Sequence, residues 1–339
     1  MSVDLAIDPG PEPSTRPGRP GGRWLTGLCW LFVVPTLGWV VVRVGGLDRG
    51  PLVQLLAFTP YVAAWTLPLL GLTLAVRRWW AAGVAALCAI VLLGLVAPRA
   101  LADGAPAADG PRLRVLTANL LAGAAAPEPL VDLVRTHRVD VLALQEFTPG
   151  AEAALDRLGL ADLLPHRQVN PEVGTTGSAL YSRLPLADVG TRHNHGGFTQ
   201  AYGTVRPDGG PPVLVESVHP MAPFALRTIV LWRTDLAAQP PATPDGPLRI
   251  LAGDFNATLD HQPLRTLLDT GYVDAAATVG SGLIGTWGPY DGDLIPPVTI
   301  DHVLVDRRIG VRRVAVFPLP GSDHRPVLAE LTLPAPGGR

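Results

Sequence analysis

Hydrophobic residues are concentrated near the start of the chain, in three long runs that contain no charged side chain. The runs cover residues 24–42, 52–76 and 79–97. Each is long enough to cross a hydrocarbon layer of about 30 Å as a helix. Three long uncharged runs in succession are typical of membrane-spanning helices and are rare as buried helices of a soluble protein. We therefore predict three transmembrane helices.

Segments rich in Pro, Gly and Ala flank these runs. Residues 1–22 contain too few apolar side chains to form a core, which predicts a disordered N-terminal tail. Residues 99–111 predict a linker to the rest of the chain. Residues 100–102 resemble a signal-peptide cleavage site, but they follow three apolar runs instead of one short run. We therefore expect the helices, within residues 23–98, to stay attached.

From residue 112 to residue 335, short apolar stretches alternate with helical patterns. This alternation predicts a single α/β domain, and its length is sufficient for a large core. Several predicted strands end in polar residues, among them Asn119, Glu146, His219 and Asp254. Functional groups are commonly held at the ends of strands on a rigid sheet. We therefore expect one polar cleft at an edge of the sheets.

Two further motifs place polar groups on strands. In GDFN, Asp254 and Asn256 are two residues apart, so their side chains lie on the same side of an extended chain. In IDHV, Asp301 and His302 lie within an apolar strand, where each polar group costs free energy unless it has a partner. Because neighbouring residues face opposite sides of a strand, we assign Asp301 to the cleft and His302 to the core.

A third motif, SDHRPV, precedes the last predicted strand. It places Asp323, His324 and Arg325 side by side in front of the apolar residues 326–333. A salt-bridged turn is the common outcome for such a triplet, whereas a catalytic loop is the functional alternative. The triplet alone leaves both outcomes open.

The residue types in the predicted cleft favour a hard divalent cation. Mg²⁺ binds a few carboxylate or carbonyl oxygens and retains several waters, so Asn119, Glu146 and Asp323 would form an open Mg²⁺ site, with Mn²⁺ as the alternative ion. The domain has no Cys, and nothing in it points to zinc. Residues 192–197 contain two histidines but no nearby carboxylates, and we expect a solvated loop there.

In order along the chain, the motifs at 253–256, 300–303 and 322–327, together with the polar strand ends, resemble the endonuclease/exonuclease/phosphatase superfamily, whose members include DNase I. The resemblance covers residues 112–335. It implies a DNase I-like four-layer α/β sandwich, in which two packed mixed sheets are flanked by helices. It also implies Mg²⁺-dependent hydrolysis of a phosphate ester.

The resemblance implies a role for each catalytic candidate. Asp254 matches the residue that positions and deprotonates the attacking water, and His219 and Asn256 would donate hydrogen bonds to the phosphoryl oxygens. His324, held by Asp301, would act as a phosphoryl clamp or a proton donor, because a nearby anion raises the pKa of an imidazole. With the resemblance, we interpret Asp323 as a metal ligand, His324 as a phosphate-binding group and Arg325 as a member of a structural ion pair.

Arginine is the only strongly basic residue in the chain, and its distribution predicts the orientation. Five arginines lie on the side of the N-terminus and of the second loop, and three lie on the other side. The first group comprises Arg16, Arg19, Arg23, Arg77 and Arg78, and the second comprises Arg43, Arg49 and Arg99. Because cytoplasmic loops carry the excess of basic residues, we predict a multi-pass protein of the cell membrane with an extracytoplasmic catalytic domain.

Charge and apolar loops indicate the substrate. From residue 111 onwards there are 19 arginines and 23 acidic residues, a net charge of −4, whereas proteins that bind nucleic acid normally carry a basic surface. The loops at 219–224 and 280–298 are rich in apolar residues, which either suit a lipid-bearing substrate or simply pack onto the sheet.

The three spans and the short motifs together resemble the VanJ-type membrane phosphatases of teicoplanin and vancomycin resistance. That resemblance implies a lipid-linked (polyprenyl) phosphate or pyrophosphate as substrate. An extracellular nuclease is the alternative. A non-catalytic membrane protein is disfavoured, because every principal motif is present.

Overall fold

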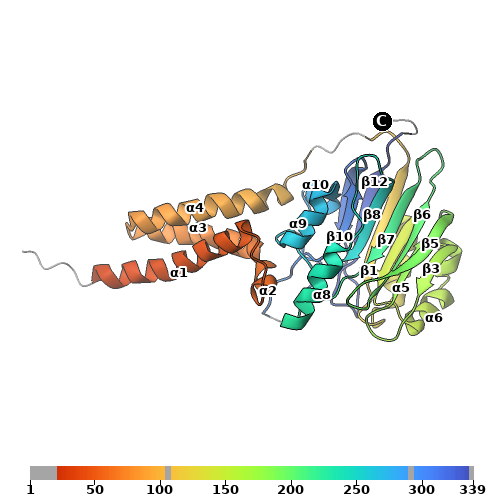
Figure 1. Cartoon of the computed structure of the whole chain (residues 1–339), viewed down its shortest axis with the longest axis horizontal. Helices are drawn as coiled ribbons and strands as arrows, with labels where there is room; N and C mark the ends of the chain where they lie inside the picture. The colour runs from red at the N-terminus through yellow and green to blue at the C-terminus, as the bar shows by residue number, and fades with distance from the viewer. Residues whose placement is uncertain (1–20, 104–107, 289–293, 336–339) are drawn as a thin grey trace, which may run out of the picture.

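The computed structural model describes residues 21–103, 108–288 and 294–335. Most of the predicted N-terminal tail and part of the predicted linker lie outside these residues. The described chain forms two six-stranded sheets and a separate group of helices (Figure 1).

Each sheet combines segments from distant parts of the chain. The first contains β1 (Arg112–Asn119), β2 (Val141–Gln145), β3 (His166–Asn170), β4 (Ser178–Ser182), β11 (Gly310–Val316) and β12 (Val327–Thr332). The second contains β5 (Leu186–His193), β6 (Thr199–Val205), β7 (Val213–Val218), β8 (Leu248–Asp254), β9 (Tyr272–Asp274) and β10 (Asp301–Asp306). The strand orders are β11-β12-β1-β2-β4-β3 and β5-β6-β7-β8-β10-β9.

Helices cover the outer faces of the two sheets. They are α5 (Pro127–His137), α6 (Pro149–Arg157), α7 (Leu160–Leu163), α8 (Leu226–Ala237) and α9 (Gln262–Asp269). The short α10 (Ala275–Thr278) instead contributes Ala275 and Ala276 to the apolar cluster between the sheets. Apolar side chains such as Val115 and Ile250 fill the space between the sheets. A second cluster joins the first sheet to α5, α6 and α7, and a third joins the second sheet to α8 and α9. The prediction of a two-sheet α/β fold is confirmed.

Strand direction brings the predicted functional residues to one edge. β1 and β2 are parallel, with Asn119 opposite Gln145, and β7 and β8 are parallel, with Val218 opposite Gly253. The carboxyl ends of each pair therefore point the same way. β10 runs antiparallel to β8, so it starts at the edge where β8 ends.

The N-terminal part of the chain is helical. Its elements are α1 (Gly21–Val44), α2 (Leu52–Leu56), α3 (Thr59–Ala75), α4 (Trp79–Val96) and the 3-10 helix η1 (Ala97–Ala100). Among the described residues, two segments are long and apolar enough to cross a membrane, Arg23–Val44 and Trp79–Ala100. The helix Thr59–Ala75 is apolar but shorter.

The second predicted span is therefore interrupted. The apolar run 52–76 divides into α2 and α3 because Pro60, in the first turn of α3, has no N–H to donate to the carbonyl oxygen of Leu56. The hydroxyl of Thr59 donates to that oxygen instead, at 2.7 Å. Apolar composition alone predicted one span here, whereas the structure has a short helix followed by a longer one.

The helices are attached to the sheets through charged and polar contacts. Asp260, in the loop after β8, accepts hydrogen bonds of 2.7 Å from Arg43 at the end of α1 and from Arg99 in η1. The predicted linker is also held at its described ends, because Asp103 N donates to Thr278 O and Gly110 N donates to Leu333 O. The helices thus form an extension of the two-sheet domain (Figure 1).

Candidate active site

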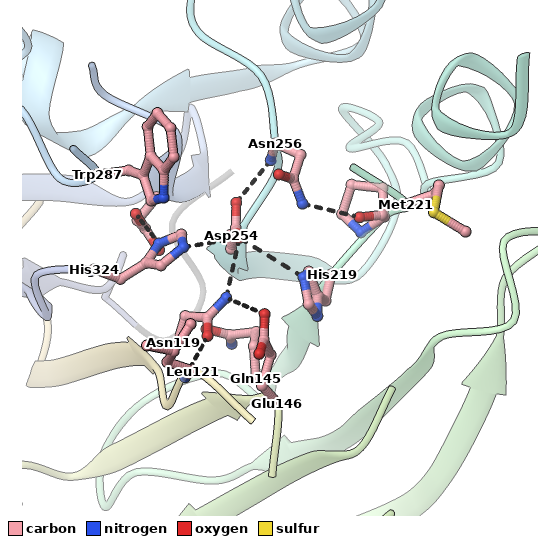
Figure 2. A network of polar contacts seen from close by, with 12 residues as sticks. Asn119, Leu121, Gln145, Glu146, His219, Met221, Asp254, Asn256, Trp287 and His324 are labelled. Atoms are coloured by element: carbon pink, nitrogen blue, oxygen red, sulfur yellow. Dashed lines mark hydrogen bonds and ion pairs between the residues drawn. The ribbon is translucent and has the colours of Figure 1, made fainter. Parts of the chain in front are cut away.

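Asp254 lies at the centre of the predicted site (Figure 2). Its Oδ2 atom is 3.1 Å from Nδ2 of Asn119 and 3.6 Å from Nε2 of both His219 and His324. These four side chains come from the ends of β1, β7 and β8 and from the loop before β12. Asp254 is 2% exposed, so its charge is governed by these neighbours and by its burial.

Asn256 turns the chain immediately after Asp254. Its backbone has a φ of 49°, in the left-handed region, and its N–H donates to Oδ1 of Asp254 at 2.8 Å. Its side-chain Nδ2 donates to Pro220 O at 3.1 Å, in the loop that follows His219. Asn256 therefore fixes Asp254 and the His219 loop relative to each other, in addition to the phosphate-binding role expected from the sequence.

His324 is held by Asp301. Its Nδ1 atom lies 2.9 Å from Oδ2 and 3.1 Å from Oδ1 of Asp301. Asp301 is directly opposite Asp254 in the β8–β10 ladder, and its N–H donates to the Thr286 hydroxyl. The contact between Nδ1 and the Asp301 carboxylate orients the imidazole of His324 so that its Nε2 faces Asp254.

The two site histidines have opposite electrostatic character. Burial and the nearby His324 lower the pKa of His219 to about 3. Burial also disfavours the charged form of His324, but the carboxylates of Asp301 and Asp254 outweigh that effect and raise the pKa of His324 to about 10. At neutral pH the site therefore contains a neutral His219 and a cationic His324.

Burial also changes the acidity of Asp254. It raises the pKa of Asp254 to about 7, against the opposing attraction of His324 and with a smaller repulsive contribution from Asp301. A carboxylate with a pKa near neutrality is a stronger base than an ordinary aspartate, and it is still available in its ionised form. Asp254 therefore has the acidity of a general base.

Glu146 and Asp323 form the acidic part of the site. Glu146 accepts hydrogen bonds from Asn119 Nδ2 at 3.2 Å and from Ala122 N at 2.5 Å, and burial raises the pKa of its carboxyl group. Oδ2 of Asp323 accepts from Trp287 Nε1 at 2.9 Å. Oδ1 of Asp323 is buried and has no hydrogen-bond partner within the described structure.

A divalent cation fits this acidic group. A buried acceptor without a partner costs free energy, and so does a buried carboxylate, and a cation bound to their oxygens relieves both costs. The Oδ1 atom of Asn119 accepts from Leu121 N at 3.0 Å, which leaves one further lone pair on that oxygen. Asp254, Asp301 and His324 form another group whose potential ligand atoms lie within 4.8 Å of one another, but the Nδ1 atom of His324 is already bonded to Asp301.

Two supporting residues were not identified from the sequence. Trp287, interpreted there only as part of an apolar loop, holds Asp323 through its indole N–H, and its backbone pairs with His324. Asn194 is buried and donates to His219 O at 2.8 Å. The prediction of a solvated loop at residues 192–197 is therefore wrong for Asn194, although the side chain of His195 is 62% exposed.

Two other assignments concern residues outside the site. His302 lies in the core as expected, with Nδ1 2.8 Å from Asp274 Oδ2 and Nε2 2.9 Å from Ala257 O. The guanidinium of Arg325 contacts Gly285 O at 3.4 Å, and the backbone N–H of Arg325 donates to Thr286 O. Arg325 thus supports the loop that carries Trp287.

The polar groups open into a large cavity of about 570 Å³. Glu146, His219, Asp254, Asp323 and His324 line one part of it, and most of the remaining lining is apolar. A cavity of this size accommodates a substrate considerably larger than a phosphate ion.

Comparison with known proteins supports the same fold. The sequence pattern of the Endonuclease/Exonuclease/phosphatase family matches residues 116–324. The crystal structure of an endonuclease/exonuclease/phosphatase from Beutenbergia cavernae is 18% identical, with 66% of this chain and 72% of that chain covered and a TM-score of 0.53. No curated protein matches the sequence.

Two TDP2 structures are also similar. Danio rerio TDP2, complexed with a single-strand DNA product, is 14% identical, with 65% of this chain and 99% of that chain covered and a TM-score of 0.51. Truncated Caenorhabditis elegans TDP2 is 17% identical, with coverage of 65% and 98% and a TM-score of 0.50. At these identities the similarity concerns the fold alone.

Proposed function

The chain belongs to the endonuclease/exonuclease/phosphatase family, and we propose from this premise that it is a membrane-tethered, metal-dependent hydrolase of a lipid-linked phosphate ester. Membership of the family supports hydrolysis of phosphoester bonds as the general class of reaction. Asp254 carries the proposal, because this buried carboxylate with a pKa of about 7 lies between a neutral and a cationic histidine.

In the proposed reaction, Asp254 orients a water molecule and accepts its proton. The imidazolium of His324, fixed by Asp301, stabilises negative charge on the phosphoryl oxygens. His219 is neutral and Asn256 carries an amide, so each donates a hydrogen bond without adding charge. Nε2 of His219 faces Asp254 at 3.6 Å, so it is the ring atom that would donate to a bound phosphoryl group.

Glu146, Asp323 and Asn119 are the residues proposed to hold Mg²⁺ or Mn²⁺. Their oxygens suit a hard cation that retains several waters. When bound, the cation would act as a Lewis acid toward the phosphoryl group.

The N-terminal helices are proposed to lie in the cell membrane. Only 17% of the most apolar window in Arg23–Val44 and 39% of that in Trp79–Ala100 is buried inside the protein. Large apolar side chains such as Trp24 (63% exposed) and Ile90 (72% exposed) are mostly uncovered by protein. The hydrocarbon layer of a membrane would shield these apolar surfaces from water. The helix Thr59–Ala75, with 17 residues, is at the short end of the range for a span.

The orientation is proposed from the same helices. Arg23, Arg77 and Arg78 lie at the helix ends away from the two-sheet domain, whereas Arg43 and Arg99 are buried and share one partner, the carboxylate of Asp260. The excess of basic residues would place the first group in the cytoplasm and the catalytic domain outside.

A lipid-linked phosphate or pyrophosphate is the proposed substrate, in keeping with the resemblance to VanJ-type membrane phosphatases. Exposed apolar residues surround the mouth of the cavity. Phe224 is 67% exposed and Ile295 is 51% exposed, and both line the cavity. Such a surface suits contact with a bilayer better than contact with a polyanion.

The test compares substrate classes with the full chain purified in detergent. Polyprenyl phosphate, polyprenyl pyrophosphate, a sphingomyelin-like diester and plasmid DNA are each incubated with Mg²⁺. We expect release of phosphate from a polyprenyl substrate and little cleavage of DNA at physiological salt. Rapid DNA cleavage would establish the nuclease alternative, and no hydrolysis of any substrate would refute the proposed activity.

A further inference from the structure

One wall of the active-site cavity does not come from the catalytic domain. Val53, Gln54, Ala57 and Phe58 line the cavity together with the catalytic groups. These residues belong to α2 and to the turn between α2 and α3, which connects two of the helices proposed to lie in the membrane. Figure 1 shows α2 between the helical extension and α8.

Hydrogen bonds attach this wall to both apolar loops of the site. Nε2 of Gln54 donates to Pro223 O at 2.7 Å, in the loop after His219. The hydroxyl of Tyr61, in the first turn of α3, donates to Pro297 O at 2.6 Å, in the loop before β10. Ala57 and Phe58 lie between these two attachments in the sequence. The connection therefore bridges the two loops on one side of the cavity.

The wall is also fixed from behind. Val53 is fully buried in the same apolar cluster as Trp232 and Phe255, and Val53 O lies 2.7 Å from Nε2 of His261. His261 directly follows Asp260, the residue that binds the arginines of α1 and η1. The position of α2 is thus set by the core of the second sheet.

The cavity changes character from one end to the other. The charged and polar groups of the reaction lie at the strand ends, whereas Ala57 and Phe58 contribute apolar surface from the turn after α2. Ala57 and Phe58 are only partly buried, so they still offer surface to a ligand. Beyond them, Trp65 on α3 is 45% exposed. Apolar surface therefore extends from the cavity along the helices.

We propose that the cavity-lining residues of α2 and of the turn after it bind the apolar chain of the substrate. This inference rests on the proposed function and adds a binding site to it. The phosphate lies at Asp254 and His324, and a linear hydrocarbon chain attached to it passes Ala57 and Phe58 toward the surface of α3. On this path the apolar chain leaves water, with protein around the end near the phosphate and lipid around the far end, and this burial of apolar surface favours binding.

A chain-length series tests the site. The full chain in detergent is assayed with Mg²⁺ and butyl, octyl or dodecyl phosphate, and farnesyl phosphate provides a branched isoprenoid of similar reach. Because each buried methylene contributes free energy, we expect kcat/KM to rise at least about tenfold from butyl to dodecyl phosphate. Ala57→Trp fills the wall and should reduce this preference to a few-fold or less.

Leu55→Trp is the matched control. Leu55 is on the same short helix and is 47% exposed, but it does not line the cavity, so its variant should retain the wild-type preference. Equal preference in the wild type and in Ala57→Trp would overturn the inference, as would a wild type that shows no preference for long chains. A higher kcat/KM for farnesyl phosphate than for dodecyl phosphate would identify branched isoprenoid chains as the preferred ligand, and a lower value would identify straight chains.

Photolabelling separates this site from the catalytic proposal. A dodecyl phosphonate with a diazirine at the end of its chain reports where the chain lies, whether or not the protein cleaves phosphate esters. Mass spectrometry should find the label on peptides that contain residues 53–65, with labelling reduced by Ala57→Trp. Labels confined to other segments would overturn the inference even if hydrolysis occurs, and labels on this segment without hydrolysis would refute only the proposed reaction.

Discussion

Nδ1 of His324 lies 2.9 Å from the carboxylate of Asp301, on the strand adjacent to the one that carries Asp254. This contact fixes the imidazole and supports its positive charge. Removing the imidazole with His324→Ala should lower kcat about 10³-fold, because the clamp acts mainly in the transition state. Asp301→Asn should lower kcat about 10²-fold by loss of orientation. Steady-state kinetics with a phosphoester checks both values.

Asp306→Asn is the control for these variants, because Asp306 lies on the same strand as Asp301 and pairs with Arg308 away from the site. Circular dichroism establishes that each variant is folded. If His324→Ala or Asp301→Asn retains near-normal turnover, the assignment of the clamp is wrong.

Asp254→Asn removes the proposed base and keeps the size of the side chain. We expect kcat to fall about 10³-fold or more, because an amide cannot accept the proton of the attacking water at neutral pH. Binding of a non-hydrolysable phosphonate should survive, since the phosphate-contacting residues remain. Loss of binding with an unchanged kcat would assign Asp254 to substrate binding instead.

The affinity for the metal ion should depend on Glu146 and on Trp287. After chelation, Mg²⁺ or Mn²⁺ should restore activity, and Glu146→Gln should raise the Mg²⁺ concentration for half-maximal activity by about 10- to 100-fold. Trp287→Phe keeps the ring but loses the hydrogen bond to Asp323, and about a tenfold increase is expected. Isothermal titration of Mg²⁺ provides a readout independent of turnover.

The exposed Glu128 serves as the control for Glu146, so Glu128→Gln should titrate like the wild type. Rescue by Zn²⁺ alone would contradict a hard-cation site. If Glu146→Gln leaves the Mg²⁺ requirement unchanged and Asp301→Asn abolishes Mg²⁺ binding in the titration, the cation binds instead to the group formed by Asp254, Asp301 and His324.

His302 predicts a pH dependence of stability away from the site. Burial opposes its charge, but the hydrogen bond to Asp274 outweighs burial and raises the pKa of His302 above 6.5. Both ring nitrogens face oxygen acceptors, so the folded protein favours the doubly protonated ring. The resulting stabilisation is complete below pH 6.5 and is lost as pH rises through the native pKa.

Denaturant unfolding of the full chain in detergent at a series of pH values measures this contribution. We expect the difference in unfolding free energy between wild type and His302→Gln to be largest at acidic pH and to shrink as the pH rises. A difference that is constant across pH would show that His302 is neutral in the folded protein.

The sequence predicted the positions of the site residues better than it predicted their support. Asn119, Glu146, His219 and Asp254 each follow an apolar strand, so a local pattern was enough to place them at the edge of a sheet. By contrast, the Trp287–Asp323 and Asn194–His219 contacts join separate segments. No periodicity along the chain specifies such pairs, and they depend on how the loops meet after folding.

The N-terminal helices show a similar limit. Apolar composition marked residues 52–76 as one helix, but the break before Pro60 depends on a single missing N–H, and the proposed role of α2 depends on its contact with a distant loop. The Arg43–Asp260 contact spans 217 positions. Charge counting used Arg43 and Arg99 only to mark the side of the membrane opposite the N-terminus, and it gave no sign that both are buried against the two-sheet domain.

Asp260 should therefore contribute strongly to stability. Its side chain is fully buried, and the arginines that bind it are less than 10% exposed. Asp260→Ala leaves two buried cations without their carboxylate partner, which should cost about 3–5 kcal/mol of unfolding free energy. Asp132→Ala, which removes an exposed partner of Arg135, should cost less than about 1 kcal/mol. Comparable losses in the two variants would show that the helices and the catalytic domain are not coupled through Asp260.

The proposed orientation places the domain and the segment before β1 outside the cell. Gly110 is a poor labelling position, because a Cβ there would lie 2.5 Å from Leu333 O. Asp109 is exposed, so Asp109→Cys in a background without Cys29 and Cys88 provides the reporter. It should react with an impermeant thiol reagent on intact cells, whereas Ser14→Cys, before the first span, should react only after lysis. The opposite pattern would place the catalytic domain in the cytoplasm, and intact cells would then fail to hydrolyse an impermeant phosphoester added outside.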